Sequence, residues 1–254
     1  MQSEISNKKH NDISTTIEAL KTSFSVVKDV DFVSMIVRLL KIIEMKDPRE
    51  NIAHTSRVSF YSLAIFNRYC QKNEIPDSEK APYEAALRVA AMLHDIGKVG
   101  LPDTILKKTG SLCESEMETI KRNTWIGARL FFPISSFVDQ ITYEVVLRHH
   151  ENWDGTGYPG YVDVLTGKPL QIDPKTGKAM GLKKEEIPLS ARIVSIADVY
   201  DVLSSRRVHK KAWREEAVLN EINRSKGFKF QPELVNIFFD VLPEIRRIKS
   251  LYSD

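Results

Sequence analysis

The stretch His94-Asp95-Ile96-Gly97-Lys98 places an imidazole, a carboxylate and an ammonium within five residues. Imidazole and carboxylate ligands together suit iron, manganese or zinc. Two such ions beside a lysine suit the hydrolysis of a phosphate ester, because the cations offset the negative charge of the phosphate. The residues before this stretch have helical periodicity, and glycine breaks that pattern directly after it. We therefore predict a metal site at the end of a helix.

A second stretch, HHENWDGTGYP at residues 149–159, sets two adjacent imidazoles before a loop rich in glycine. Glycine permits tight or left-handed backbone and proline fixes one dihedral angle, so this loop is suited to hold Tyr158 rigidly beside a ligand. Taken alone, His149 and His150 have a simpler explanation, which is attraction to the dipole of a helix that ends there. The combination with the first stretch favours a metal site.

The remaining sequence has mostly helical periodicity, which predicts an all-α fold. His54, Val58, Tyr61 and Ile65 recur at steps of four, three and four residues and therefore share one helix face. No strong alternating pattern of the kind that marks a strand competes with the helices. The other predicted helices cover residues 14–45, 78–95, 111–132, 137–151, 188–205, 211–225 and 231–241.

Residues 160–187 stand apart from this helical pattern. The letters Asp, Thr-Gly-Lys occur at 163–168 and again at 173–178, which predicts an irregular loop or a short β-hairpin with two turns. The position of this insertion after the Gly/Pro loop makes it a candidate lid over the site. A solvated surface insertion is the favoured alternative.

The composition is that of an ordinary globular protein. Of 254 residues, 42% are hydrophobic and 28% are charged, and a net charge of +3 is too small to indicate a nucleic-acid polymer as the partner. Cys70 and Cys113 lack the spacing of a metal site, and reduced thiols are favoured over a disulfide.

The N-terminal region predicts neither secretion nor membrane insertion. Residues 1–13 are polar and lack the apolar core of a signal peptide. The apolar run at 32–45 is too short to span a bilayer, and Arg38 and Lys41 interrupt it. We therefore expect a cytoplasmic protein with a buried helix in this region.

The strings HTSRV (54–58), HDIGK (94–98), HHENWDGTGYP (149–159) and ADVYD (197–201) follow one another along the chain. In this order they resemble the HD-GYP family, the branch of the HD metal-dependent phosphohydrolases that hydrolyses cyclic di-GMP in bacteria. The resemblance covers about residues 35–240. It implies an all-α HD-domain helical bundle with a GYP loop, followed by the insertion at 160–187.

The resemblance also divides the chain into two parts. Residues 34–254 are expected to form the HD-GYP domain, and residues 1–33 a polar tail and leader helix. The helix at 14–45 is expected to cover the core, with some contact in a homodimer. Family members use the GYP loop to bind proteins with diguanylate cyclase (GGDEF) domains, which makes such proteins candidate partners here.

The metal ligands implied by the resemblance are Glu50, His54, His94, Asp95, His149, His150 and Asp198. Two divalent ions are expected, iron or manganese, with Asp95 bridging them. Glu50 is a candidate ligand for a third ion, although a surface position in the first helical turn explains it equally well. His54 alone would usually be a core histidine, and Asp198 with Asp201 would form a solvated acidic stripe.

The resemblance implies roles beside the substrate as well. Lys98 and Asp95 are the candidate catalytic residues. The candidate substrate contacts are Lys98, Tyr158, Asp201, Arg207 and Lys210. Where the family usually has Arg-Pro-Tyr-Lys, this chain has Arg-Val-His-Lys at 207–210, so the charges are retained in a different loop.

Asn123 is the main departure from the family pattern, because it occupies the position of a family histidine after HDxGK. An amide oxygen is a weaker donor to these metals than an imidazole. Three outcomes remain open: reduced activity, an altered metal preference, or a site that binds a nucleotide without hydrolysing it.

The leading prediction is a metal-dependent phosphodiesterase that converts cyclic di-GMP to linear pGpG or GMP in second-messenger signalling. One alternative is a catalytically weakened module that binds cyclic di-GMP or a GGDEF protein. Another is a hydrolase of a different cyclic dinucleotide, cyclic GMP-AMP.

Overall fold

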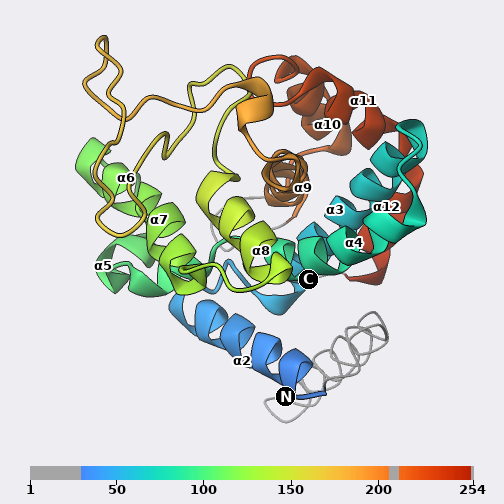
Figure 1. The fold of residues 1–254 in the computed structure, drawn as a ribbon, viewed down its shortest axis with the longest axis horizontal. Helices are drawn as coiled ribbons and strands as arrows, with labels where there is room; N and C mark the ends of the chain where they lie inside the picture. The colour runs from blue at the N-terminus through green and yellow to red at the C-terminus, as the bar shows by residue number, and fades with distance from the viewer. Residues whose placement is uncertain (1–29, 206–211, 253–254) are drawn as a thin grey trace.

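The computed structural model describes residues 30–205 and 212–252. Within this part of the chain the fold is all-α, as predicted, and α9 runs through the middle of the molecule (Figure 1). Helices α3, α8, α10 and α11 pack around α9. The α-helices are α2 (Val30–Lys46), α3 (Ile52–Lys72), α4 (Asp77–Met92), α5 (Asp103–Leu106), α6 (Glu114–Lys121), α7 (Asn123–Ala128), α8 (Phe137–Arg148), α9 (Leu189–Ser204), α10 (Glu215–Arg224), α11 (Pro232–Asp240) and α12 (Leu242–Leu251).

The apolar core has a large and a small part. In the large part, Tyr61 of α3 meets Tyr200 of α9 edge to face, and Tyr200 in turn contacts Phe238 of α11. The small part lies between α2, the 3-10 helix η1 (Ile96–Gly100), α7 and α8. Both parts meet α8, whose Val145 and Val146 belong to the large and the small part respectively. The predicted metal-binding stretches follow α4 and α8, and both of these helices contribute residues to the two parts of the core.

Helix α2 covers the small part of the core, as expected for the end of the predicted helix 14–45. Its Ile36, Leu40 and Ile43 are buried, whereas Met35 and Met45 are exposed. The expected homodimer contact and the division at residue 33 stay predictions. Over the residues described, no helix combines the length and apolarity needed to cross a bilayer.

Several predicted helix boundaries were wrong. The helix predicted at 78–95 ends at Met92, so the HD pair lies in the turn after it. The helix predicted at 111–132 is split into α6, α7 and η2 (Arg129–Phe131). Helix α12 was missed, because Pro243 was interpreted as a stop although proline fits the first turn of a helix.

The split before α7 brings two glycines into contact. A Cβ atom on Gly97 would lie 1.8 Å from the backbone oxygen of Asn123 and 2.6 Å from the nitrogen of Gly127. Only glycine allows η1 and α7 to approach this closely. The glycine of HDIGK thus brings Asn123 next to the HD pair.

The insertion at 160–187 has the predicted two turns and no regular strand. Its isolated antiparallel bridges join Val162 to Pro169 and Ile172 to Ala179. Gly167 and Gly177 close the two turns with positive φ angles of 70° and 68°. The insertion extends along α6 and α7 (Figure 1).

Candidate metal centre

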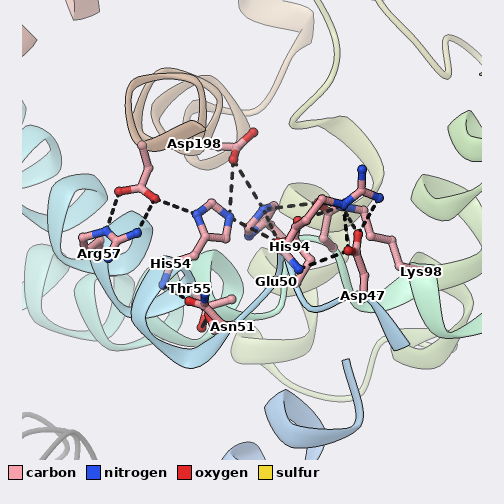
Figure 2. Close-up of polar contacts among 12 residues, drawn as sticks. Asp47, Glu50, Asn51, His54, Thr55, Arg57, His94, Lys98 and Asp198 are labelled. Carbon is pink, nitrogen blue, oxygen red and sulfur yellow. Dashed lines mark hydrogen bonds and ion pairs between the residues drawn. The ribbon is translucent and has the colours of Figure 1, made fainter. Parts of the chain in front are cut away.

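Side chains from distant parts of the chain converge at the joint between the two parts of the core (Figure 2). Asp198 of α9 points toward the rings of His54 and His94. Nearly all of the predicted ligands meet here: Glu50 before α3, His54 on α3, His94 and Asp95 after α4, His149 at the end of α8, and Asp198 on α9.

The three buried histidines share one arrangement of ring nitrogens. The Nδ1 atom of His54 lies 2.8 Å from Asp201 Oδ2, that of His94 2.9 Å from the Ala91 oxygen, and that of His149 2.9 Å from the Val145 oxygen. Each of these acceptors requires the proton on Nδ1. In the neutral imidazole, the form that binds a metal, the lone pair is therefore on Nε2, and all three Nε2 atoms are buried without a hydrogen-bond partner. This is the orientation that protein metal sites use.

One group of ligand atoms surrounds His54. Its Nε2 atom lies 3.2 Å from Glu50 Oε2 and 3.6 Å from Asp198 Oδ1. The Nε2 atom of His94 lies 3.9 Å and 3.8 Å from the same two oxygens. Glu50 Oε2 is buried and has no hydrogen-bond donor. These atoms are close enough together to bind one cation.

A second group shares His94. The Nε2 atom of His94 lies 3.6 Å from Asp95 Oδ2, and the Nε2 atom of His149 lies 3.7 Å from Asp95 Oδ1. His94, Asp95 and His149 are all buried. Because Asp95 offers two oxygens and His94 takes part in both groups, the two cation positions are neighbours.

Lys98 lies among three carboxylates. Its Nζ atom is 2.7 Å from Glu50 Oε1, 2.9 Å from Asp95 Oδ2 and 3.3 Å from Asp47 Oδ2. Burial opposes ionisation of Glu50 and Asp95, but Lys98 together with the neighbouring histidines outweighs it and holds the pKa of both carboxyls well below the ordinary value. Asp47 was missed from the sequence, because it was interpreted only as part of a helix stop with Pro48.

The field at His54 favours positive charge. Burial opposes protonation of this imidazole, but Glu50 and Asp201 outweigh it and raise its pKa to about 10. A cluster of buried carboxylates that stabilises an imidazolium also stabilises a metal cation at the same position.

Asp201 lies behind His54 and does not face the ligand atoms. It is buried, and its two oxygens accept hydrogen bonds from Arg57 Nε at 2.7 Å and Arg57 Nη2 at 2.9 Å, besides contacting His54. Burial opposes ionisation of Asp201, yet His54 and Arg57 outweigh it and lower the pKa of the carboxyl to about 2. Asp201 was expected beside the substrate, but this position suits a residue that orients His54. Arg57, three residues after His54, was missed.

Asn123 reaches the centre at the position expected from the sequence. Its Nδ2 atom donates to Asp95 Oδ1 at 2.6 Å, while its own Oδ1 atom is buried without a partner. The amide therefore holds the carboxylate of the second group of ligand atoms.

His150 and Tyr158 lie to one side of the centre. His150 belongs to neither group of ligand atoms found among the described residues. Its ring stacks on that of Tyr158 at 4.7 Å between centroids and contacts the ring of His149 at 3.9 Å. Burial and the neighbouring His149 hold the pKa of His150 well below its ordinary value. A neutral imidazole beside the centre is suited to bind a metal or a ligand.

Glu151 is a further residue that the sequence did not reveal as structural. It is buried, and it accepts hydrogen bonds from the backbone nitrogen of Gly160 at 2.8 Å and of Leu182 at 3.3 Å. The carboxylate of Glu151, the residue after His150, thus binds the backbone at both ends of the insertion. Arg207 and Lys210, the remaining predicted substrate contacts, lie outside the described residues.

The donor set fits divalent metal ions. Buried imidazole nitrogens and carboxylate oxygens without partners are costly unless a cation binds them. A mixed nitrogen and oxygen set suits iron, manganese or zinc better than magnesium or calcium, which prefer oxygen alone.

The sequence model of the HD domain matches residues 51–203. The chain belongs to the HD domain family. The match includes HTSRV, HDIGK, the double histidine and ADVYD, so the resemblance inferred from those strings is confirmed.

Relatives of this HD domain include a cyclic di-GMP phosphodiesterase of Thermotoga maritima, which is 35% identical over 224 residues. That alignment covers 88% of this chain and 53% of the relative. The chain spans about half the length of this relative and of a cyclic di-GMP phosphodiesterase of Vibrio cholerae that is 32% identical over 250 residues.

Two solved structures resemble the fold of this HD domain. One is an HD-GYP-type protein of Bdellovibrio bacteriovorus, with a TM-score of 0.50 and 20% identity, covering 75% of this chain and 51% of the other. The other is a cyclic GMP-AMP specific phosphodiesterase of Vibrio cholerae, with a TM-score of 0.51 and 19% identity, covering 85% and 50%. At these identities the likeness supports the fold alone.

Proposed function

We propose that this HD domain is a metal-dependent phosphodiesterase that hydrolyses cyclic di-GMP to linear pGpG or GMP. The observation that carries the proposal is the convergence of the free Nε2 atoms of His54, His94 and His149 on the carboxylates beside Lys98. A relative with this activity in its name supports the choice of substrate.

The centre would hold two divalent ions, iron or manganese, with Glu50 available to a third. When bound, such ions lower the pKa of a coordinated water and offset the charge of a phosphodiester. Glu50, His54 and Asp198 would bind one ion, His149 the other, and His94 and Asp95 would lie between them.

Other residues of the chain would support this chemistry. Lys98 would place a positive charge beside the scissile phosphate, because its ammonium already lies among the metal-binding carboxylates. Asp201 would hold His54 in the tautomer that presents Nε2. Tyr158 would border the bound nucleotide, since its ring stacks on His150.

Two further assignments belong to the same proposal. GGDEF-domain proteins are candidate partners through the GYP loop, and the cytoplasm is the candidate location.

The test is chromatography of cyclic di-GMP incubated with protein purified without oxygen and supplied with ferrous or manganous ion. We expect linear dinucleotide or GMP, and no product from His94→Ala. Hydrolysis that persists in His94→Ala would contradict the proposal, because His94 takes part in both groups of ligand atoms.

A second candidate is hydrolysis of cyclic GMP-AMP, which is favoured by the name of a relative from Vibrio cholerae, a 3'3'-cGAMP-specific phosphodiesterase that is 29% identical over 220 residues. The same incubation with cyclic GMP-AMP separates the two. A higher kcat/KM on the mixed dinucleotide would replace the leading substrate. Tight binding of cyclic di-GMP without product would indicate the third candidate, a signalling module weakened by Asn123.

A further inference from the structure

A cleft of about 790 Å³ lies beside the metal centre, between α6, α7, the GYP loop and the insertion. This volume is typical of sites for small ligands. The lining residues used below are Lys121, Arg122, Trp125, Tyr158, Thr166 and Lys178. The candidate metal ligands are not among the lining residues, so the cleft is a separate compartment.

The outer wall of the cleft is held in place by several contacts. The Trp125 ring fills the space that a Cβ atom on Gly167 would need, 2.5 Å away. The backbone oxygen of Val164 accepts a hydrogen bond from Arg129 Nε at 2.9 Å. Lys178 Nζ lies 2.9 Å from Glu118 of α6. With both ends of the insertion tied to Glu151, the insertion forms a wall.

Two lining residues connect the cleft with the metal centre. Arg122 lines the cleft, while its neighbour Asn123 donates to Asp95. Tyr158 also lines the cleft and stacks on His150, with the ammonium of Lys121 5.4 Å from its ring centroid. A ligand in the cleft would therefore lie next to the side of the metal centre on which Asp95 lies.

The chemistry of the lining suits a nucleotide. Lys121 and Lys178 share Glu118, whereas Arg122 is exposed and has no ion-pair partner among the described residues. A guanidinium fork binds a phosphate or the edge of a guanine, and aromatic side chains such as Trp125 and Tyr158 contact bases. The hydroxyl of Thr166 adds a donor and acceptor for a ribose or base edge.

We infer that this cleft binds the second nucleotide of the cyclic dinucleotide, the one whose phosphodiester is not being cleaved. The inference rests on the proposed function, because it assigns a second subsite to that substrate. A cyclic dinucleotide with one phosphodiester at the metal centre must place its other nucleotide next to it. The cleft is the adjoining compartment, and much of its wall comes from the insertion at 160–187.

The first test is equilibrium binding of cyclic di-GMP to metal-free protein in EDTA by calorimetry, where no turnover occurs. We expect Arg122→Ala to weaken binding on the order of tenfold, the loss of a hydrogen bond to a charged group. The control is Lys175→Ala, which removes the same charge from an exposed position that does not line the cleft. Equal affinities for Arg122→Ala and Lys175→Ala would overturn the inference.

The second test separates the subsite from the metal centre by kinetics with manganous ion. We expect Arg122→Ala to raise KM for cyclic di-GMP on the order of tenfold, with kcat little changed. Hydrolysis of bis(p-nitrophenyl) phosphate, which has no second nucleotide, should stay at the wild-type rate. Equal losses on both substrates would assign Arg122 to the metal centre and overturn the subsite.

The two proposals fail in different ways. Binding that depends on Arg122 without any product would leave the subsite standing and contradict the phosphodiesterase. Product formation with no effect of Arg122→Ala on binding or KM would leave the phosphodiesterase standing and contradict the subsite.

Discussion

His54, His94 and His149 are each held through Nδ1 and free at Nε2, but the acceptors differ. His94 and His149 use backbone oxygens one turn earlier, so their orientation is local. His54 depends on the carboxylate of Asp201, which comes from a different helix. A single substitution at Asp201 would therefore disturb the orientation of His54, whereas the other two histidines depend only on backbone atoms. The buried pair of Arg57 and Asp201 holds His54 in place.

Replacing Asp201 by Asn should lower the free energy of unfolding by about 3 kcal/mol, because it leaves the buried Arg57 without its carboxylate. Urea denaturation measures the loss. Asp240→Asn is the matched control, since its pairs with Arg68 and Lys72 are exposed and worth less than about 1 kcal/mol. Equal losses in both variants would contradict the structural role given to Asp201.

Asn123 differs from the family pattern, because it is an amide at a position where the family has a histidine. Its Nδ2 atom binds Asp95 Oδ1, an oxygen that the second cation position needs. Asn123→His should exchange this competing donor for an imidazole and tighten binding of the second ion. Metal content after dialysis against a weak chelator is the measurement, with turnover of cyclic di-GMP alongside. If neither changes, another group already replaces the missing imidazole.

At the scale of elements, the GYP loop and the insertion behave as one unit built on Glu151. Burial raises the pKa of this carboxyl, and Arg148 with the Gly160 nitrogen opposes the rise. The GYP loop contributes Tyr158 to the lining of the cleft, and the insertion contributes much of its wall. The insertion was predicted as a surface loop or a lid, and its contacts with α6 and α7 make it a fixed wall.

Glu151→Gln should loosen the insertion, because an amide group offers fewer acceptors to Gly160, Leu182 and Arg148. We expect faster cleavage by trypsin within residues 160–187, followed by mass spectrometry. Glu185→Gln is the control, since Glu185 is exposed at the end of the insertion and its side chain has no hydrogen bond or ion pair among the described residues. Cleavage at the same rate in both variants would mean that Glu151 does not hold the insertion.

At the scale of the whole molecule, the metal centre joins the two parts of the core. Glu50, Asp95 and Asp198 come from segments far apart in the chain, and the repulsion among their carboxylates opposes packing until a cation offsets it. Metal binding and folding stability are therefore coupled.

Chelation should lower the melting temperature. An ion present at 100 times its Kd contributes about 2.7 kcal/mol, which corresponds to about 5–10 °C for a chain of this size. Differential scanning fluorimetry with manganous ion and with EDTA measures the difference. Asp95→Ala should show little or none of this shift, whereas Asp103→Ala, at an exposed helix start, should keep it. An Asp95→Ala variant with the full shift would contradict the candidate metal centre.

The sequence by itself determined the helical fold and the chemical types of the ligands. Helical periodicity is local, and HDIGK with the double histidine carries its chemistry in adjacent residues. Tertiary structure alone decided which groups face one another. Asp198 and Asp201 share a helix, yet Asp198 points to the Nε2 atoms of His54 and His94 and Asp201 to Arg57, because the direction of each side chain depends on how α9 packs against α3. Asp47, Glu151 and the cleft likewise arise from contacts between segments far apart in the chain, which no local pattern records.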